Sequence, residues 1–293
     1  MSLARYAGVL DSVRGIAWPS LRRVTSALPG PHVSRVRGTT AEFVEYRPYR
    51  QGDDPKKIDW KLLGRTDRVY IRVSQERTIL PTMFVLDASA SMAFPPGTHA
   101  KWELARQLAV GLAAVARHRG DPVGLALADA RGTQMIAPRT RKTVLDEMMQ
   151  ILEREPAGEA TLAPAASSAM RHGARVVIIT DFLGDADALL AAGRTYAATG
   201  AELYAIHVVD RAELDPDPKK MLLWDPEHPE LRRPMSPPAR AAYVRRFAEW
   251  RTEMAREWRA IGAVYAMAVP GEEPWRQVIR RITTPQGTAR PTG

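Results

Sequence analysis

Two hydrophobic patterns alternate along most of the chain. Short continuous apolar runs are typical of strands buried on both faces, and apolar residues three or four positions apart are typical of helices. The strands expected from this pattern are 83–86, 123–128, 133–136, 174–180, 202–209 and 264–269. The helices expected are 101–118, 141–155, 162–171, 186–199, 240–260 and 275–282. Alternation of this kind predicts an α/β fold, Rossmann-like, with an open, mostly parallel sheet and helices on both faces.

The first 80 residues follow a different pattern. Residues 1–32 mix apolar and basic positions at helical spacing, which predicts an amphipathic arm broken at Pro19. Residues 33–80 are rich in arginine and aromatic residues and predict a small β-rich region. We expect the large domain to cover 81–284, with a proline- and charge-rich insertion at 210–238, and residues 285–293 to form a disordered tail.

Composition narrows the class of protein. The 293 residues are 45% hydrophobic and 26% charged, which is ordinary for a globular protein. The absence of cysteine excludes disulfides, zinc thiolates and thiol nucleophiles. The net charge of +9 fits an arginine-rich solvated surface, and it also leaves open attraction to an acidic protein, a nucleic acid or an anionic lipid. Neither a membrane-spanning apolar stretch nor a signal peptide is recognisable, so a cytoplasmic location is expected.

Residues that could bind a ligand lie where expected strands end. Asp87, Ser89 and Ser91 follow the first buried strand at alternate positions, so in an extended segment their side chains share a face. Thr161 lies just before a predicted helix, and Asp181 comes directly after the strand 174–180. The carboxyl ends of parallel strands form the edge where ligands bind in an open α/β sheet. Hydroxyl and carboxylate oxygens suit a hard cation, with Mg²⁺ expected first and Mn²⁺ or Ca²⁺ as alternatives.

These five positions resemble the metal-ion-dependent adhesion site of the von Willebrand factor A superfamily. That site is an Asp-x-Ser-x-Ser run, a distant threonine and a later aspartate, and the resemblance extends over residues 82–269. It implies that the two serines and the threonine lie closest to the metal, and that a partner's Asp or Glu fills an open coordination position. The sequence departs from the family pattern in having Glu159-Ala160 where Gly-Gly is usual, and Phe182 where Gly is often found.

The N-terminal region is similar to an uncharacterised bacterial family with an A-type domain. The resemblance is carried by Glu42-Phe43, Arg47-Pro48-Tyr49, Gly52-Asp53-Asp54, Ile58-Asp59-Trp60 and Glu76-Arg77. Members of that family are typically encoded near MoxR-type AAA+ ATPases. The resemblance therefore implies a cofactor or adaptor of such an ATPase in chaperone-like maturation of other proteins.

The Gly-Asp-Asp region itself is interpreted as structural. We expect Asp53, Asp54 and Asp59 to pair with Arg47, Arg50 and Arg65, and Trp60 to pack in the core. A docking surface is the alternative interpretation.

Three functions compete at this point. A metal-dependent protein-binding module is favoured because the five positions include no catalytic base, and the chain is expected not to be an enzyme. A metal-assisted hydrolase is the second hypothesis, because carboxylates beside a metal can activate water. The third is a basic nucleic-acid or membrane-surface binder that uses the N-terminal arm, and nucleic acid is considered the weaker partner.

Overall fold

The computed structural model describes residues 2–21, 44–74, 79–217, 222–224, 232–234 and 236–284. The chain forms two compact units. One unit contains Met1–Arg22 together with Leu80–Gly293, and the other contains Arg23–Ile79. The predicted tail at 285–293 and the second part of the predicted arm lie outside the described residues.

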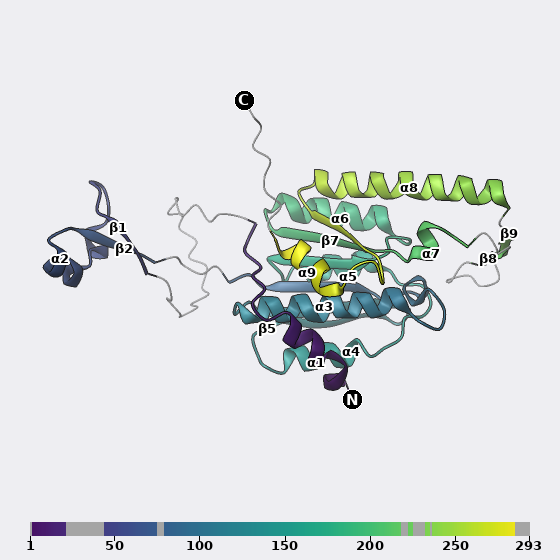
Figure 1. Cartoon of the computed structure of the whole chain (residues 1–293), viewed down its shortest axis with the longest axis horizontal. Coiled ribbons are helices and arrows are strands. Elements are labelled where there is room, and N and C mark those ends of the chain that lie inside the picture. Colours follow the sequence, from purple (N-terminus) through teal and green to yellow (C-terminus); the bar gives the residue numbers. More distant parts are fainter. Residues whose placement is uncertain are drawn as a thin grey trace, which may run out of the picture. The chain divides into compact units, whose positions relative to one another are not determined.

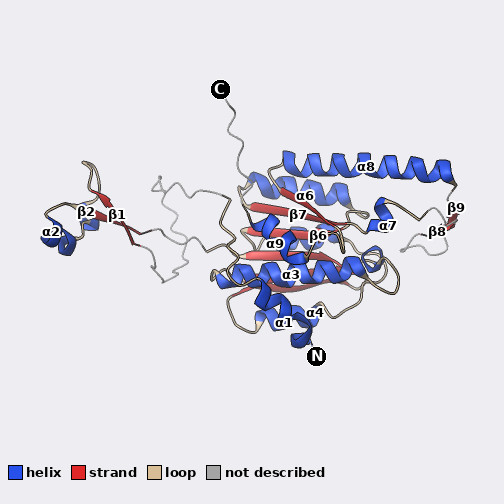
Figure 2. Ribbon diagram, in the orientation of Figure 1, coloured by secondary structure: helices blue, strands red, loops and turns tan. Residues whose placement is uncertain are grey.

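A six-stranded sheet is the centre of the larger unit (Figures 1 and 2). Its strand order is β10-β7-β6-β3-β4-β5, and every neighbouring pair is parallel except β4 with β5. The strands are β3 Thr82–Asp87, β4 Val123–Asp129, β5 Gly132–Arg139, β6 Arg175–Thr180, β7 Glu202–Val208 and β10 Val264–Ala268. The predicted open, mostly parallel α/β sheet is confirmed, including an edge strand near 133–136.

Helices cover both faces of this sheet. Side chains of β3 alternate between the faces, with Phe84 and Leu86 in one core and Met83 and Val85 in the other. The helices on the Phe84 face are α1 Ser2–Ser12, α3 Ala100–His118, α4 Val144–Ile151 and α9 Trp275–Thr283. Those on the Met83 face are α5 Leu162–Met170, α6 Ala186–Ala198 and α8 Pro237–Ala260. Burial on both faces explains why these strands read as continuous apolar runs.

The first helix belongs to the larger unit and is not a separate arm. Its residues Tyr6 and Val9, and the following Val13 and Trp18, are at most 5% exposed and lie in the same core as α3. The predicted amphipathic character is therefore correct, but its apolar face is already used inside the fold. That burial counts against the hypothesis that this arm binds a membrane surface.

A buried ionic cluster holds the end of this N-terminal segment on the sheet. The guanidinium of Arg175 lies 4.2 Å from the ring centroid of Trp18, and Arg175 Nε donates to Glu202 over 2.8 Å. Glu202 also accepts hydrogen bonds from the Ser20 hydroxyl and the Leu21 backbone N–H. Because a buried charge needs a partner, this cluster fixes where the segment leaves the sheet.

The smaller unit contains β1 Val44–Pro48, η1 Pro55–Lys57, α2 Trp60–Thr66 and β2 Tyr70–Ser74. β1 and β2 are antiparallel. In its Gly-Asp-Asp region, Arg47 binds Asp53 through both guanidinium nitrogens, at 2.8 and 2.7 Å, which is one of the expected ion pairs. Asp54 caps η1, and Asp59 caps α2 by accepting from two backbone N–H groups. The prediction that Trp60 packs in the core is wrong, since 66% of this residue is exposed.

The expected insertion at 210–238 contains short elements. These are α7 Arg211–Leu214 and a β hairpin formed by β8 Leu222–Trp224 and β9 Arg232–Pro234. The last of the predicted insertion residues already belong to α8, which Ser236 caps. None of the described helices combines the length and the apolar character needed to cross a membrane.

The anchoring of the N-terminal segment gives the first testable prediction. Trp18→Ala removes a fully buried indole from between Arg175 and Tyr204, so it should lower the free energy of unfolding by about 3–5 kcal/mol. Urea denaturation followed by circular dichroism measures this change. The control is Leu21→Ala, which alters a residue that is 42% exposed and should change stability by less than about 0.5 kcal/mol. Equal effects of the two variants would show that the segment is not part of the core.

Candidate metal centre

The site begins with the register of two neighbouring parallel strands. Leu86 of β3 lies opposite Ile179 of β6, so the next residues, Asp87 and Thr180, emerge together at the carboxyl edge of the sheet. Asp87 is 7% exposed, and its Oδ2 accepts a 2.6 Å hydrogen bond from the Thr180 hydroxyl. Its Oδ1 accepts from the Ser89 backbone N–H over 2.9 Å. These two bonds fix the orientation of the carboxylate.

Burial dominates the ionisation of Asp87. Removal of the carboxylate from water, assisted by the nearby charge of Asp181, raises the pKa of Asp87 to about 6. The hydrogen bonds from Thr180 and Ser89 act in the opposite direction and do not outweigh burial. A cation beside Asp87 would favour the charged form of this group.

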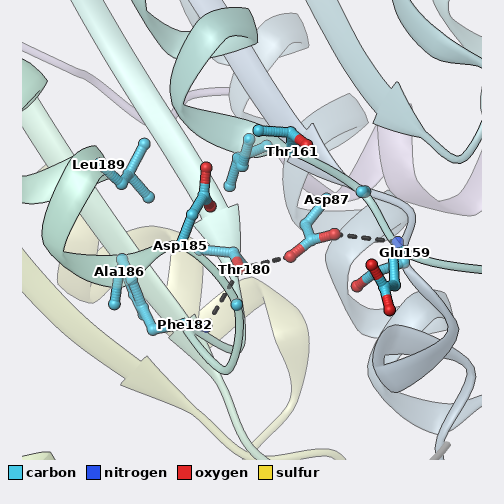
Figure 3. A pocket seen from close by; sticks show the side chains of 12 residues that line it. Asp87, Glu159, Thr161, Thr180, Phe182, Asp185, Ala186 and Leu189 are labelled. Atoms are coloured by element: carbon cyan, nitrogen blue, oxygen red, sulfur yellow. Dashed lines mark hydrogen bonds between the residues drawn. The ribbon is translucent and has the colours of Figure 1, made fainter. Parts of the chain in front are cut away.

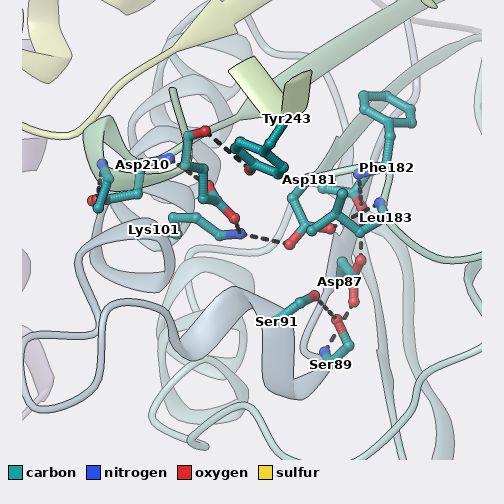
Figure 4. Close-up of polar contacts among 12 residues, drawn as sticks. Asp87, Ser89, Ser91, Lys101, Asp181, Phe182, Leu183, Asp210 and Tyr243 are labelled. Atoms are coloured by element: carbon teal, nitrogen blue, oxygen red, sulfur yellow. Dashed lines mark hydrogen bonds and ion pairs between the residues drawn. The ribbon is translucent and has the colours of Figure 1, made fainter. Parts of the chain in front are cut away.

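Two serine hydroxyls lie next to Asp87. Ser89 and Ser91 are 3% and 4% exposed, and their Oγ atoms are 3.0 Å apart (Figure 4). Ser89 stands at the N-cap of η2 Ala90–Ala93 but makes no side-chain cap bond. Both hydroxyls therefore face each other and the carboxylate end of the site instead of the helix backbone.

Thr161 comes to the same place from another loop. It stands at the N-cap of α5 without a side-chain cap bond, because Asp185 Oδ2 takes that role by accepting from the Ala163 backbone N–H over 2.8 Å. The Thr161 loop is held against the serine loop by two backbone bonds, which are Ala90 N–H to Gly158 O and Ala157 N–H to Ala88 O. Asp185 thus caps α5, and the hydroxyl of Thr161 makes no cap bond to this helix.

The fifth predicted residue, Asp181, has an internal counterion. Its Oδ2 accepts from Lys101 Nζ over 2.7 Å, and its Oδ1 accepts from the Leu183 backbone N–H over 3.1 Å. The same ammonium donates to Glu213 Oε1 over 2.7 Å (Figure 4). Lys101 is fully buried, so α3, the end of β6 and α7 meet at one positive charge.

The pKa values of this group follow from that arrangement. Burial alone would raise the pKa of Asp181, but Lys101 together with the hydrogen bonds from Leu183 and Ser91 lowers it. Burial would likewise lower the pKa of Lys101, and the two carboxylates raise it instead. Burial raises the pKa of Glu213, against the effect of Lys101. The result is an ionised Lys101–Asp181 pair at neutral pH.

A pocket opens beside these groups (Figure 3). Its volume is about 220 Å³, and Asp87, Ser89 and Thr161 line it. Ser91 and Asp181 are adjacent to the pocket and are not part of its lining. Phe182 also lines the pocket. It adopts a left-handed backbone conformation with φ of 58° and packs against His207 and Trp258, which explains how a bulky residue replaces the glycine that the family pattern often has.

The donor set fits a hard cation. Neighbouring oxygen ligands of an octahedral Mg²⁺ ion, each about 2.0–2.1 Å from the metal, lie about 2.9 Å apart, which agrees with the spacing of the two serine hydroxyls. Among the described residues no group of three or more His, Cys, Asp or Glu side chains is placed to hold a metal ion, so hydroxyls would supply most ligands here. Asp181 differs from Asp87 because its Oδ2 is paired with the buried ammonium of Lys101, whereas Asp87 accepts hydrogen bonds from the neutral groups of Thr180 and Ser89.

Sequence reasoning missed four residues of this site. Thr180, Asp185 and Glu159 line the pocket, and Lys101 neutralises Asp181. The sequence did contain a signal for Thr180, because this residue directly precedes Asp181 at the end of an expected strand. No sequence signal marked Lys101, which reads as an ordinary first-turn lysine of an amphipathic helix.

Comparison with known proteins identifies a family. The family model described as "Protein of unknown function DUF58" matches residues 45–253. The chain belongs to this family. Two similar proteins are the uncharacterized protein Rv1480 of Mycobacterium tuberculosis (strain ATCC 25618 / H37Rv) and the uncharacterized protein Mb1516 of Mycobacterium bovis. Each is 29% identical over 253 residues, covering 83% of this chain and 78% of the relative.

Solved structures give weaker likenesses to this DUF58 chain. The conserved hypothetical protein BatB from Bacteroides thetaiotaomicron is 15% identical, with a TM-score of 0.44 over 69% of this chain and 95% of that chain. The SpRpn10 VWA domain is 11% identical, with a TM-score of 0.38 over 69% of this chain and 94% of that chain. Likeness at this level carries no argument about what the DUF58 chain binds, and the association with a MoxR-type ATPase stays a prediction.

The buried lysine gives the second testable prediction. Lys101→Met leaves Asp181 and Glu213 buried without their cation, so it should lower the free energy of unfolding by about 3–5 kcal/mol at neutral pH. Chemical denaturation measures the loss, and Lys142→Met, at an exposed lysine, is the matched control. A Lys101→Met variant as stable as its control would contradict the ionic role of this residue.

Proposed function

We propose that this chain is a metal-dependent protein-binding module. The observation that carries the proposal is the pair of Ser89 and Ser91 hydroxyls, 3.0 Å apart beside the buried carboxylate of Asp87, at the side of an open pocket. A cluster of buried oxygen donors next to solvent is what a hard cation requires, and it leaves room for one more ligand from outside.

The proposed roles differ among the five residues. Ser89, Ser91 and Thr161 would hold Mg²⁺, or Mn²⁺ or Ca²⁺, with Asp87 supplying the nearest negative charge. Asp181 would act through the Ser91 hydroxyl, because its own charge is already paired with the buried ammonium of Lys101. The metal would supply positive charge that attracts a carboxylate of a partner protein.

The identity of the partner rests on the sequence alone. The ordered motifs from Arg47 to Trp60 support an adaptor of a MoxR-type AAA+ ATPase in chaperone-like maturation, with either the ATPase or its client providing an Asp or Glu. A cytoplasmic location is part of the same proposal. Binding, rather than hydrolysis, is favoured because His207, the histidine packed against Phe182, is fully buried, and burial lowers its pKa to about 3, which makes it a poor general base.

Metal binding is the direct test. Calorimetric titration of Mg²⁺ and Mn²⁺ into the wild-type chain should show one site, and saturation should raise stability by about 2.7 kcal/mol at a hundredfold excess over Kd. Asp87→Ala and Ser89→Ala should abolish both effects, while Asp146→Ala on α4 should retain them. Asp87→Ala is a suitable variant because burial disfavours the charged form of Asp87 in the folded chain. Removal of this carboxylate should therefore not by itself prevent folding. Metal stabilisation that survives in Asp87→Ala would contradict the proposed site.

The pH dependence of metal binding follows from Asp87. A proton and the metal compete for this carboxylate, whose pKa in the folded chain is about 6. Mn²⁺ affinity should therefore be nearly constant above pH 7 and about tenfold weaker at pH 5, where roughly a tenth of Asp87 is ionised. Calorimetry at constant ionic strength measures the profile. An affinity that does not change between pH 5 and pH 7 would show that Asp87 is not the titrating ligand.

A further inference from the structure

The smaller unit exposes a tryptophan on a helix that is fixed at both ends. Trp60 is 66% exposed, the highest fraction among the large hydrophobic side chains that the structure describes. It is the first residue of α2, which Asp59 caps by accepting from two backbone N–H groups. Asp67 ends the helix in a left-handed conformation, with its N–H bonded to the Leu63 carbonyl. The exposed indole is therefore attached to a well-defined backbone.

The outward face of α2 carries positive charge next to this indole. At 3.6 residues per turn, Trp60, Lys61, Gly64 and Arg65 share one side of the helix, and all four are exposed. The two leucines between them are half-buried. Neither Lys61 nor Arg65 forms an ion pair with a described side chain of this unit, where Arg47 is the paired cation. Open space remains at Gly64, because nothing lies within 4 Å of an added Cβ.

A second exposed ring and the charge of the unit indicate what this face can bind. Tyr46 is 43% exposed, and its hydroxyl donates to Oδ2 of Asp59, the residue before Trp60, over 3.1 Å. Exposed tryptophan and arginine are typical of the residues that contribute most to protein interfaces. Residues 44–74 contain eight Lys or Arg and five Asp or Glu. This basic but mixed charge suits acidic side chains of a protein better than the regular phosphates of a nucleic acid.

We propose that this face of α2 binds an acidic segment of a partner protein that also carries an apolar side chain. The apolar side chain packs on the indole of Trp60, and carboxylates beside it pair with Lys61 and Arg65. The net charge of +9 on the whole chain attracts such a segment. The face includes none of the five residues of the candidate metal centre, so the inference does not rest on the proposed metal-dependent function.

Access to the indole in the free full-length chain is the first test. Labelling with 5-fluorotryptophan gives a ¹⁹F resonance for each tryptophan, and single substitutions such as Trp60→Phe assign them. A neutral gadolinium chelate should strongly broaden the resonance of Trp60. The resonances of Trp102 and Trp258, which are 1% and 0% exposed, should stay sharp. A Trp60 resonance as protected as these two would overturn the inference.

Short peptides then test the chemistry of the partner. The probe is the blocked peptide Asp-Glu-Phe-Glu-Asp, compared with Asn-Gln-Phe-Gln-Asn, which has no charge, and Asp-Glu-Ala-Glu-Asp, which has no ring. In NMR titrations of the full chain, the probe should bind about fivefold more tightly than either control, because each lacks one kind of contact. The affinity should be the same with Mg²⁺ and with EDTA. Equal binding of the three peptides, or tighter binding of the probe with Mg²⁺, would overturn the inference.

Variants locate the peptide on α2. Trp60→Ala should remove the preference for the ring, and the double variant Lys61→Gln/Arg65→Gln should remove the preference for charge. Lys142→Gln, at an exposed lysine of the larger unit, should change neither preference. Gly64→Glu and Gly64→Gln both extend into open space, so the fold is kept, and only the Glu variant should repel the probe, by about fivefold relative to Gln. Preferences that persist in these variants, or a thymidine oligonucleotide that binds the face more tightly than the probe, would contradict an acidic protein partner.

Discussion

Two carboxylates buried side by side are the constraint on which this structure depends. The parallel register of β3 and β6 places Asp87, the last residue of β3, and Asp181, which directly follows β6, at one edge of the sheet, where the charge of Asp181 helps to raise the pKa of Asp87. Lys101 neutralises one of the two charges by pairing with Asp181 inside the protein. Asp87 receives only hydrogen bonds, from Thr180 and Ser89, and no cation from the described part of the chain. The remaining unbalanced charge is the physical reason to expect a cation from solution.

Strand β6 carries a buried ion at each end. At its start, Arg175 pairs with Glu202 and lies over Trp18, which attaches the N-terminal segment. At its end, Asp181 pairs with Lys101, which in turn reaches α7 through Glu213. Tyr243 of α8 donates a hydrogen bond to the backbone carbonyl of Glu213, so this long helix is connected to the same cluster. The strand β6 therefore links the site to the N-terminal segment and to α8 by ionic and hydrogen-bonded contacts.

The order and type of the main elements could be predicted from the sequence because each strand is buried on both faces and each helix has a clear apolar stripe. The residues Asp87, Ser89 and Ser91 could be predicted as neighbours because they follow a strand at alternate positions. Lys101 could not be found in this way, since its role depends on a contact with Asp181, which is 80 residues away. The exposure of Trp60 was also missed, because a tryptophan in a small β-rich region reads as core until its few neighbours are known. Long-range ion pairs and the limited core of a small unit are tertiary properties that local patterns do not encode.

The central claim is that a hard cation binds between the serine loop and the Thr161 loop. Anomalous diffraction from crystals of the chain soaked in Mn²⁺ tests it most directly, because the signal locates the metal independently of any activity. The account predicts a single strong peak about 2.0–2.2 Å from the hydroxyl oxygens of Ser89 and Ser91, with Lys101 still bound to Asp181. A peak at another cluster, or a metal that displaces Lys101 and binds Asp181 directly, would contradict it.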